Sequence, residues 1–281
     1  MSARQPVEGL AVEGVVVGGL AVGGLAVESF RPHFAREGIF NIRDLGGIEL
    51  AGGARVAPGR LIRADALQRA RFTSALLEQL RVVRVLDLRD EREREAAGVL
   101  DAAAIDVAHH PVLDPTFTWH DAEHPEPATL LAHRYRVILD SFSSRFVGAL
   151  ESIADAFDRD DTAAVAYHCA VGKDRTGLLT ALVLDALGAP DDAIVADYVR
   201  SGRATAVQVN WLWSFGMPQG DTSDEELATG VWSARPETMA TTLEWLDAEH
   251  GGARRYLDDA GLPAEVLETL ERSLAVSVDQ G

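Results

Sequence analysis

The sequence predicts an α/β protein with a mostly parallel central sheet flanked by helices. Two short apolar runs, Val82–Leu88 and Ala163–His168, have the length and character of buried strands. Helix-patterned segments alternate with them, which is typical of a parallel sheet because parallel strands are usually joined through a helix. No linker-like stretch interrupts the chain after residue 29, so we expect one domain over residues 30–281.

Turn signals and apolar periodicity define the elements of the first half. Gly46 and Gly47 mark a turn, and Thr73–Leu80 has the pattern of a short helix. Ile105–Val112 is a further candidate strand. Asp114–Pro127 is rich in proline, histidine and acidic residues and predicts a loop.

The second half of the chain is mainly helix-patterned. Leu130–Phe157 predicts a long helix with a break near residues 141–144, and Leu178–Leu187 predicts an apolar helix that ends at Gly188. Asp191–Arg203 predicts the next helix, whereas residues 204–236 give no clear prediction. Three closing helices are expected at Glu237–His250, Ala253–Ala260 and Pro263–Leu274.

The composition excludes several kinds of partner and site. The chain has 26 Lys and Arg against 44 Asp and Glu, and its net charge of −18 argues against nucleic acid and anionic membranes as partners. Any site for an anionic substrate must therefore be built locally. The single cysteine excludes an intramolecular disulfide and any multi-cysteine metal site.

Residues 1–29 form a low-complexity extension rich in Gly, Val and Ala, in which residues 9–28 read as four pentads. The uncharged stretch Gly14–Val27 is shorter than the ~20 apolar residues of a membrane span, and it lacks the basic flank and cleavage site of a signal peptide. We expect no stable membrane insertion and a cytoplasmic location. The alternatives are a strand pair packed on the domain, an export signal, and secretion without a cleaved signal.

The only cysteine, Cys169, lies in the segment His-Cys-Ala-Val-Gly-Lys-Asp-Arg-Thr-Gly at residues 168–177. This segment joins a predicted buried strand to a predicted helix, so that backbone N–H groups and a helix N-terminus converge on one point. Such a point stabilises a thiolate, which is the nucleophilic form of cysteine, and it equally stabilises a phosphate dianion.

The spacing from Cys169 to Arg175 is Cys-x5-Arg. A loop of this length curls around a tetrahedral group, and the Arg175 guanidinium can bind two of its oxygens. Gly172 allows a positive φ, Thr176 can hydrogen-bond the sulfur, and His168 is expected to order the loop. The residues expected to bind phosphate are Ala170, Val171, Gly172, Lys173, Asp174 and Arg175.

Other interpretations of this segment are weaker. A Walker-type nucleotide loop would need Gly at position 167 and Ser or Thr at position 174, where the chain has Tyr167 and Asp174. The remaining alternatives are a structural loop with a buried thiol, another Cys-loop transferase, and an inactive phosphate-binding protein. The Arg-Thr-Gly ending argues against a sulfur transferase, and every residue type expected for catalysis is present.

The loop resembles that of the Cys-x5-Arg protein tyrosine phosphatase superfamily. Its Gly-Lys-Asp-Arg-Thr form resembles the bacterial branch typified by mycobacterial tyrosine phosphatase B, which includes lipid phosphatases. Asn41–Gly47, Arg63–Leu67 and Asp87–Arg89 match further motifs of this branch, so the resemblance runs from about residue 40 to the C-terminus. It implies a tyrosine phosphatase-like fold and hydrolysis of phosphotyrosine without metal or cofactor. Phosphoserine, phosphothreonine and phosphoinositides are further candidate substrates.

Two aspartates are candidates for the acid that protonates the leaving oxygen. Asp87 ends the strand expected beside the loop-bearing strand, and the resemblance implies acid catalysis at this position, so we favour it. Asp174 in the loop is the second candidate. The structural alternatives are an ion pair of Asp87 with Arg63 or Arg89, and a helix N-cap at Asp174.

Three further features bear on specificity and cofactors. Lys173 could bind additional phosphates of a lipid headgroup, with a solvated loop lysine as the alternative. The resemblance implies that helices at about residues 190–275 form a lid over the site. We expect no metal at His109, His110, His120 and His124, because no cysteine accompanies them.

Overall fold

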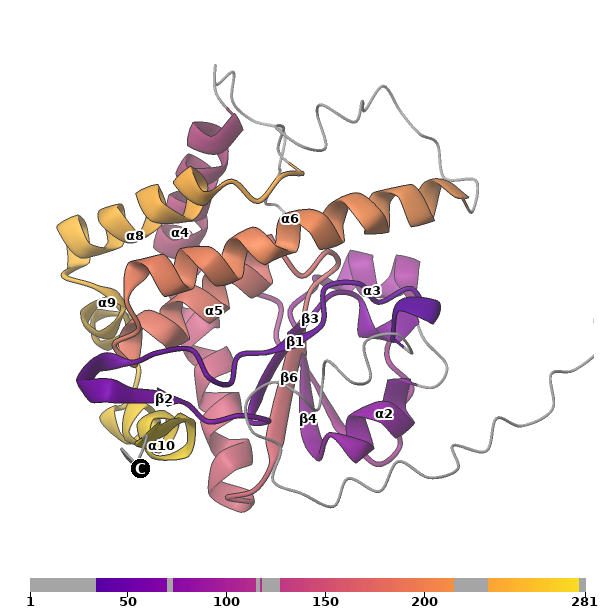
Figure 1. Cartoon of the computed structure of the whole chain (residues 1–281), viewed down its shortest axis with the longest axis horizontal. Helices are drawn as coiled ribbons and strands as arrows, with labels where there is room; N and C mark the ends of the chain where they lie inside the picture. The colour runs from indigo at the N-terminus through magenta and orange to yellow at the C-terminus, as the bar shows by residue number, and fades with distance from the viewer. Residues whose placement is uncertain (1–33, 70–72, 115–116, 118–126, 215–231, 278–281) are drawn as a thin grey trace, which may run out of the picture.

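The computed structural model describes residues 34–69, 73–114, 117, 127–214 and 232–277. Its centre is a five-stranded sheet in the order β1-β3-β6-β4-β5, in which β1 is antiparallel to β3 and all other pairs are parallel. The α/β fold class predicted from the sequence is therefore confirmed (Figure 1). The strands are β1 (Arg43–Asp44), β3 (Leu61–Ala64), β4 (Val82–Asp87), β5 (Asp106–His109) and β6 (Ala164–His168).

The alternation of side chains along the strands separates two hydrophobic clusters. On β6, Val165 and Tyr167 belong to one cluster, whereas Ala164 and Ala166 belong to the other. Successive side chains of a strand point to opposite faces of the sheet, so each cluster fills one face. All residues of β6 are buried, and the strand that leads into the cysteine loop is thus packed from both sides.

Helices cover both faces of the sheet. The larger cluster contains residues of α4 (Pro127–Arg159) and α5 (Asp174–Ala186), while α2 (Thr73–Gln79) contributes to the smaller one. α6 (Asp191–Ser214) packs on α5 and runs across the end of the sheet from which the cysteine loop leaves (Figure 1). The other elements are η1 (Ala51–Gly53), β2 (Ala54–Val56), η2 (Leu67–Arg69), α3 (Glu91–Ala97), α8 (Pro236–His250), α9 (Ala253–Asp259), α10 (Ala264–Leu274) and β7 (Ala275–Ser277).

The predicted helices in the described residues are confirmed, with differences in extent. The break in α4 lies at Phe142, where φ is −129° and ψ is 24°, as expected from residues 141–144. α5 begins earlier than predicted, at Asp174, because the loop turns directly into the helix. α6 continues to Ser214 instead of ending near residue 203, and its buried Gln208 binds the loop from these additional turns.

Two elements have weak sequence signals. β3 has only four residues, all of them buried. One of the four is Arg63, so the segment shows neither a continuous apolar run nor an alternation of apolar and polar residues. α3 lies in a stretch that reads only as charged. Its start is nevertheless marked by a capping box, in which the side chains of Asp90 and Glu93 each accept a hydrogen bond from the other's backbone N–H.

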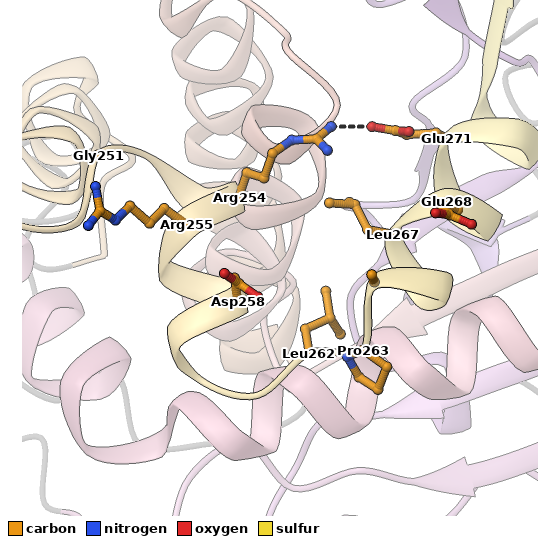
Figure 2. A pocket seen from close by; sticks show the side chains of 10 residues that line it. Gly251, Arg254, Arg255, Asp258, Leu262, Pro263, Leu267, Glu268 and Glu271 are labelled. Atoms are coloured by element: carbon orange, nitrogen blue, oxygen red, sulfur yellow. Dashed lines mark hydrogen bonds and ion pairs between the residues drawn. The ribbon is translucent and has the colours of Figure 1, made fainter.

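A pocket between α9 and α10 lies away from the cysteine loop (Figure 2). Arg254 on α9 pairs with Glu271 on α10 along its edge. α9 is attached to the last turn of α5 through Ala253, whose N–H donates to Asp185, whereas the loop precedes the first turn of α5. None of the residues predicted to form the site lines this pocket. Among the helices that the structure describes, none is both long enough and apolar enough to cross a bilayer.

Phe146→Ala should lower the free energy of unfolding by about 3–5 kcal/mol, because the buried ring would leave a cavity in the larger cluster. Urea denaturation followed by circular dichroism measures this change. The control is Val137→Ala on the same helix, at a side chain that is 37% exposed, which should change stability by only about 0.5 kcal/mol. Equal losses in the two variants would contradict the placement of Phe146.

Candidate active site

The thiol of Cys169 lies directly after β6, the middle strand of the sheet, in the loop that leads into α5. The residue is 1% exposed. Its Sγ accepts a hydrogen bond from the backbone N–H of Gly172, with an N–S distance of 3.2 Å. The backbone N–H of Gly172 is thus directed at the sulfur.

The carbonyl groups of three consecutive loop residues are bound by side chains from outside the loop. All of the donors are amide or guanidinium nitrogens of buried or partly buried residues. In order, the pairs and their N–O distances are Gln208 to Ala170 (3.1 Å), Asn41 to Val171 (3.1 Å), Asn41 to Gly172 (3.0 Å) and Arg63 to Gly172 (2.7 Å).

These bonds determine where the loop N–H groups point. In a trans peptide, the C=O of one residue and the N–H of the next residue point in opposite directions. The peptide between Val171 and Gly172 has this arrangement: Asn41 binds its carbonyl, and its N–H donates to Cys169 Sγ. The Gly172 N–H therefore turns toward the sulfur because the carbonyl of the same peptide is held on the other side.

The motifs that precede the loop in the sequence lie against it in space. Asn41 belongs to the first motif, and Arg63 belongs to the second, on β3 beside β6. Asp65, also in the second motif, is buried and accepts a hydrogen bond from the backbone N–H of Asn41 at 2.9 Å. The two motifs thus fix each other and the loop.

Gly172 has the backbone conformation expected from the sequence, with φ of +72°. A Cβ at this position would lie 2.6 Å from the carbonyl oxygen of Ala64 on β3. Both the positive φ and the close approach of β3 therefore require glycine here.

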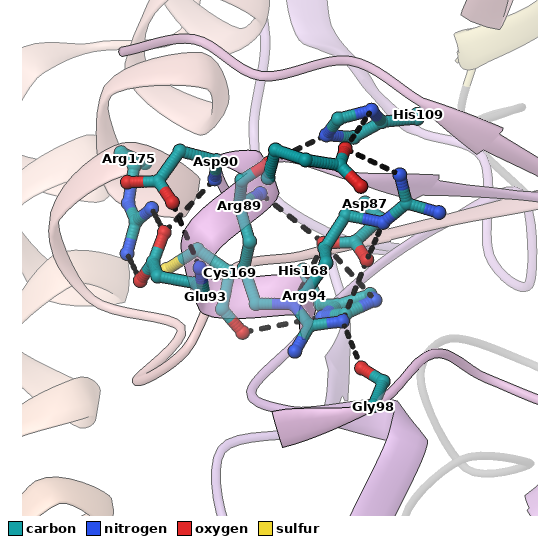
Figure 3. A network of polar contacts seen from close by, with 11 residues as sticks. Asp87, Arg89, Asp90, Glu93, Arg94, Gly98, His109, His168, Cys169 and Arg175 are labelled. Carbon is teal, nitrogen blue, oxygen red and sulfur yellow. Dashed lines mark hydrogen bonds and ion pairs between the residues drawn. The ribbon is translucent and has the colours of Figure 1, made fainter. Parts of the chain in front are cut away.

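Arg175, in the first turn of α5, is bound by Glu93 of α3 (Figure 3). Its two terminal nitrogens donate to separate carboxylate oxygens, NH2 to Oε1 at 2.7 Å and NH1 to Oε2. Glu93 Oε2 also accepts from the backbone N–H of Asp90 at 2.9 Å, so the capping box of α3 holds the carboxylate that orients Arg175. Burial opposes the charge of Glu93, but its hydrogen bonds with Arg175 outweigh this effect and lower its pKa.

Glu93 is a site residue that the sequence interpretation missed. Its signal was the Asp-x-x-Glu spacing of residues 90–93, which predicts a helix start, but nothing in the local sequence links that helix to Arg175.

Asp87 ends β4 in a buried ion-pair network (Figure 3). Its carboxylate accepts from Arg89 Nε at 2.9 Å and NH2 at 2.7 Å, and Arg94 Nε lies 3.5 Å away. Burial alone would raise the pKa of Asp87, but the hydrogen bonds and the positive charge of Arg89 lower it overall. The predicted structural alternative, an ion pair with Arg89, is confirmed.

Asp174 has a different environment, although it lies one residue before Arg175. Its Oδ1 accepts from the Tyr135 hydroxyl at 2.7 Å and pairs with Lys173 Nζ at 3.2 Å, while the side chain is 18% exposed. The predicted N-cap at Asp174 is wrong, because Lys173 occupies the N-cap position and no side chain caps the helix. Tyr135 continues the network to the hydroxyl of Tyr198 on α6 at 2.8 Å.

Lys173 does not face solvent, so the prediction of a solvated loop lysine is wrong. The residue is 2% exposed, and its Nζ donates to the carbonyl of Ser233 at 3.1 Å as well as pairing with Asp174. The segment before α8 covers the lysine, and the ammonium group is used within the protein.

His168 and Thr176 are buried residues at the two ends of the loop. His168 is buried, its Nδ1 lies 3.2 Å from the carbonyl oxygen of Cys169, and burial lowers its pKa to about 4, so the ring is neutral at pH 7. The expected hydrogen bond from Thr176 to the sulfur is absent: Thr176 Oγ1 has no partner among the described residues, and the bond to Sγ comes from Gly172.

Only part of the region predicted to form a lid lies at the loop in the described structure. α6 binds it through Gln208, and the segment before α8 binds it through Ser233. α8 and α10 pack against α4, and α9 packs against α5.

The histidines considered as a metal cluster do not converge in the described part of the chain. His109 Nε2 lies 2.8 Å from the carbonyl oxygen of Arg89, and the adjacent His109 and His110 both line a second pocket with Arg145. His120 and His124, like the N-terminal pentads, fall outside the described residues. No group of three His, Cys, Asp or Glu within that part could hold a metal ion.

The chain is similar in sequence to known tyrosine phosphatases. Residues 34–276 match the family model described as "Tyrosine phosphatase family". A protein of Cupriavidus necator that carries the name of a tyrosine-protein phosphatase is 30% identical over 82% of this chain and 84% of its own. The triple specificity protein phosphatase PtpB of Mycobacterium tuberculosis is 29% identical over 80% of this chain and 92% of its own. The crystal structure of TpbA from P. aeruginosa aligns with 53% of this chain and 74% of its own at 20% identity and a TM-score of 0.29.

Gly172→Ala should reduce kcat/KM for an aryl phosphate by about 10²-fold, because the Cβ meets Ala64 and displaces the N–H groups that turn toward the sulfur. Steady-state kinetics measures this loss. Gly148→Ala on α4 is the matched control, because a Cβ there meets nothing within 4 Å. Unchanged kinetics in Gly172→Ala would contradict the role given to the loop conformation.

Proposed function

The chain belongs to the tyrosine phosphatase family and is a phosphatase, and we propose that it hydrolyses phosphotyrosine through a cysteinyl-phosphate intermediate on Cys169. One observation carries the proposal: the backbone N–H of Gly172 donates to the Cys169 thiol within the loop, and Arg175 follows in the first turn of α5. This arrangement stabilises a thiolate and a phosphoryl group alike.

In the first proposed step, Cys169 Sγ attacks phosphorus, the S–P bond forms, and the P–O bond to the tyrosine breaks. The loop N–H groups and Arg175 bind the other phosphoryl oxygens, where negative charge is concentrated. Glu93 keeps the Arg175 guanidinium oriented. When phosphate binds, its oxygens accept some of the hydrogen bonds that Arg175 donates.

We propose that Asp174 protonates the leaving oxygen. Its side chain is 18% exposed against 2% for Asp87, and it lies in the loop itself, one residue before Arg175. Asp87 is held as an ion by Arg89, and its lowered pKa opposes proton donation. These contacts favour the second of the two candidates derived from the sequence.

In the second proposed step, water attacks phosphorus and the S–P bond breaks. Asp174, now ionised, takes the proton of the water. The Cys169 thiolate leaves as the bond between phosphorus and the water oxygen forms, and inorganic phosphate is released.

Phosphotyrosine in a phosphorylated protein is the proposed substrate. The M. tuberculosis relative is named for triple specificity, which supports tests of phosphoserine and phosphothreonine as well. Lys173 donates to Ser233 and pairs with Asp174, so its side chain does not present a charge to a second phosphate. This makes phosphoinositides the less favoured class.

We further propose that the phosphatase unit comprises residues 30–281, with residues 1–29 as an extension outside it. The family match over residues 34–276 supports this division. The C-terminal helices add residues such as Leu246, Leu257 and Leu270 to the same cluster that packs on the sheet, which supports a single unit.

The natural chain should release phosphate from p-nitrophenyl phosphate and from a phosphotyrosine peptide in the presence of a chelator. Cys169→Ser should lose this activity while keeping its circular dichroism spectrum, because the serine hydroxyl does not ionise in the site. Phosphoserine and phosphothreonine peptides and a phosphoinositide, assayed in parallel, define the substrate class. No turnover by the natural chain, or natural turnover by Cys169→Ser, would refute the proposal.

Asp174→Asn should reduce kcat/KM most for substrates with poor leaving groups, such as phenyl phosphate, by about 10²-fold or more, and less for p-nitrophenyl phosphate. Asp87→Asn should affect the two substrates equally, because its main effect is to leave Arg89 without its buried partner. The ratio of kcat/KM between the substrates separates chemistry from stability. A leaving-group dependence in Asp87→Asn alone would assign the acid to Asp87.

A further inference from the structure

Asp197, on α6, is a buried carboxylate that no step of the proposed reaction uses. It is 4% exposed and lies between two buried arginines of the sheet, Arg43 on β1 and Arg63 on β3. Arg43 Nε donates to Oδ1 at 2.6 Å, and Arg63 NH1 donates to Oδ2 at 2.5 Å. Arg43 NH2 also donates to Ser201 Oγ at 3.1 Å, one turn further along α6.

Arg43 and Arg63 each connect Asp197 to the cysteine loop through hydrogen bonds. Arg63 uses its second terminal nitrogen to bind the carbonyl of Gly172 at 2.7 Å. Arg43 acts through Asn41: its NH1 donates to Asn41 Oδ1, which leaves Nδ2 to bind the loop carbonyls. One carboxylate therefore fixes, by two routes, the peptide groups on either side of Gly172.

The charge of Asp197 allows two guanidinium groups to lie together in the interior. Burial and the neighbouring charge of Arg63 lower the pKa of Arg43 to about 10. Burial opposes the charge of Asp197, but Arg43 and Arg63 outweigh it and lower its pKa, so it is ionised at neutral pH. Without that charge, two buried cations would face each other with no counterion, which is strongly unfavourable.

We propose that Asp197 is a positioning residue of the phosphatase reaction. Through Arg43 and Arg63 it sets the orientation of the two peptide groups around Gly172, one of which donates its N–H to the sulfur of Cys169. The inference rests on the function proposed for the loop. It also gives a physical role to the arginines at positions 43 and 63, which the sequence motifs contain without explaining.

A purely structural role for Asp197 would be to anchor α6 on the sheet. Its loss would then lower stability, but the folded protein would bind phosphate as before. The two roles therefore differ in the anion affinity and thiolate content of the folded protein.

Asp197→Asn keeps the shape of the side chain and removes its charge. We expect kcat/KM for p-nitrophenyl phosphate to fall about 10²-fold and the inhibition constant of inorganic phosphate to rise about tenfold. Alkylation of Cys169 by iodoacetamide at pH 6 should also slow, because fewer molecules carry the thiolate. All three are measured where circular dichroism shows the variant to be folded.

Asp185→Asn is the matched control. Asp185 lies in the last turn of α5 and accepts from the backbone N–H of Ala253 at 2.6 Å, so that it also anchors a helix, α9. It lies about 17 Å along the helix from Asp174. Its loss should lower the thermal midpoint and leave phosphate inhibition and alkylation unchanged.

Arg43→Lys keeps the proposal testable if Asp197→Asn does not fold, because it retains a buried cation beside Asp197 but loses the donor to Asn41. It should weaken phosphate inhibition in the same direction. A folded variant whose phosphate inhibition constant and Cys169 alkylation rate equal those of the unsubstituted protein would overturn the proposal. If the natural chain hydrolyses no substrate, the proposed function fails instead, and phosphate binding by calorimetry together with alkylation still decides the role of Asp197.

Discussion

The planar trans peptide group is the constraint on which the site depends. A loop can direct several N–H groups to one point only if the carbonyls of the same peptides are bound on the opposite side. Here Gln208, Asn41 and Arg63 bind the carbonyls of residues 170–172, and the N–H of Gly172 meets the sulfur of Cys169 as a result. The proposed anion site therefore depends as much on the residues outside the loop as on the loop itself.

Positive charge around the loop is paired with carboxylates, in a chain whose net charge is −18. Each arginine discussed around the loop has a carboxylate partner, as in Arg175 with Glu93 and Arg89 with Asp87. These pairs keep the guanidinium groups ionised and oriented in the interior, where an unpaired charge would be costly. A phosphate that binds at the loop meets fixed donors, so little reorganisation is needed when charge develops on its oxygens.

The sequence predicted the fold class and the main helices, because long apolar or periodic segments such as β6, α4 and α5 carry strong local patterns. It also predicted the position of Cys169 at the end of a strand and the positive φ of Gly172. It did not predict the hydrogen bonds that join segments over a hundred residues apart, since no local pattern indicates which buried polar group another will meet. The bond expected from Thr176 to the sulfur, and the alternative of a solvated Lys173, were wrong for this reason.

We propose above all that Cys169 is a nucleophile in a loop whose Gly172 N–H is directed at it, because the loop carbonyls are bound on the opposite side. A crystal structure of the protein with orthovanadate tests this claim most directly. We expect vanadium bonded to Cys169 Sγ, its equatorial oxygens bound by loop N–H groups and Arg175, and the carbonyls of residues 170–172 still bound by their present partners. Vanadate bound away from Cys169, or loop carbonyls turned toward it, would contradict the account.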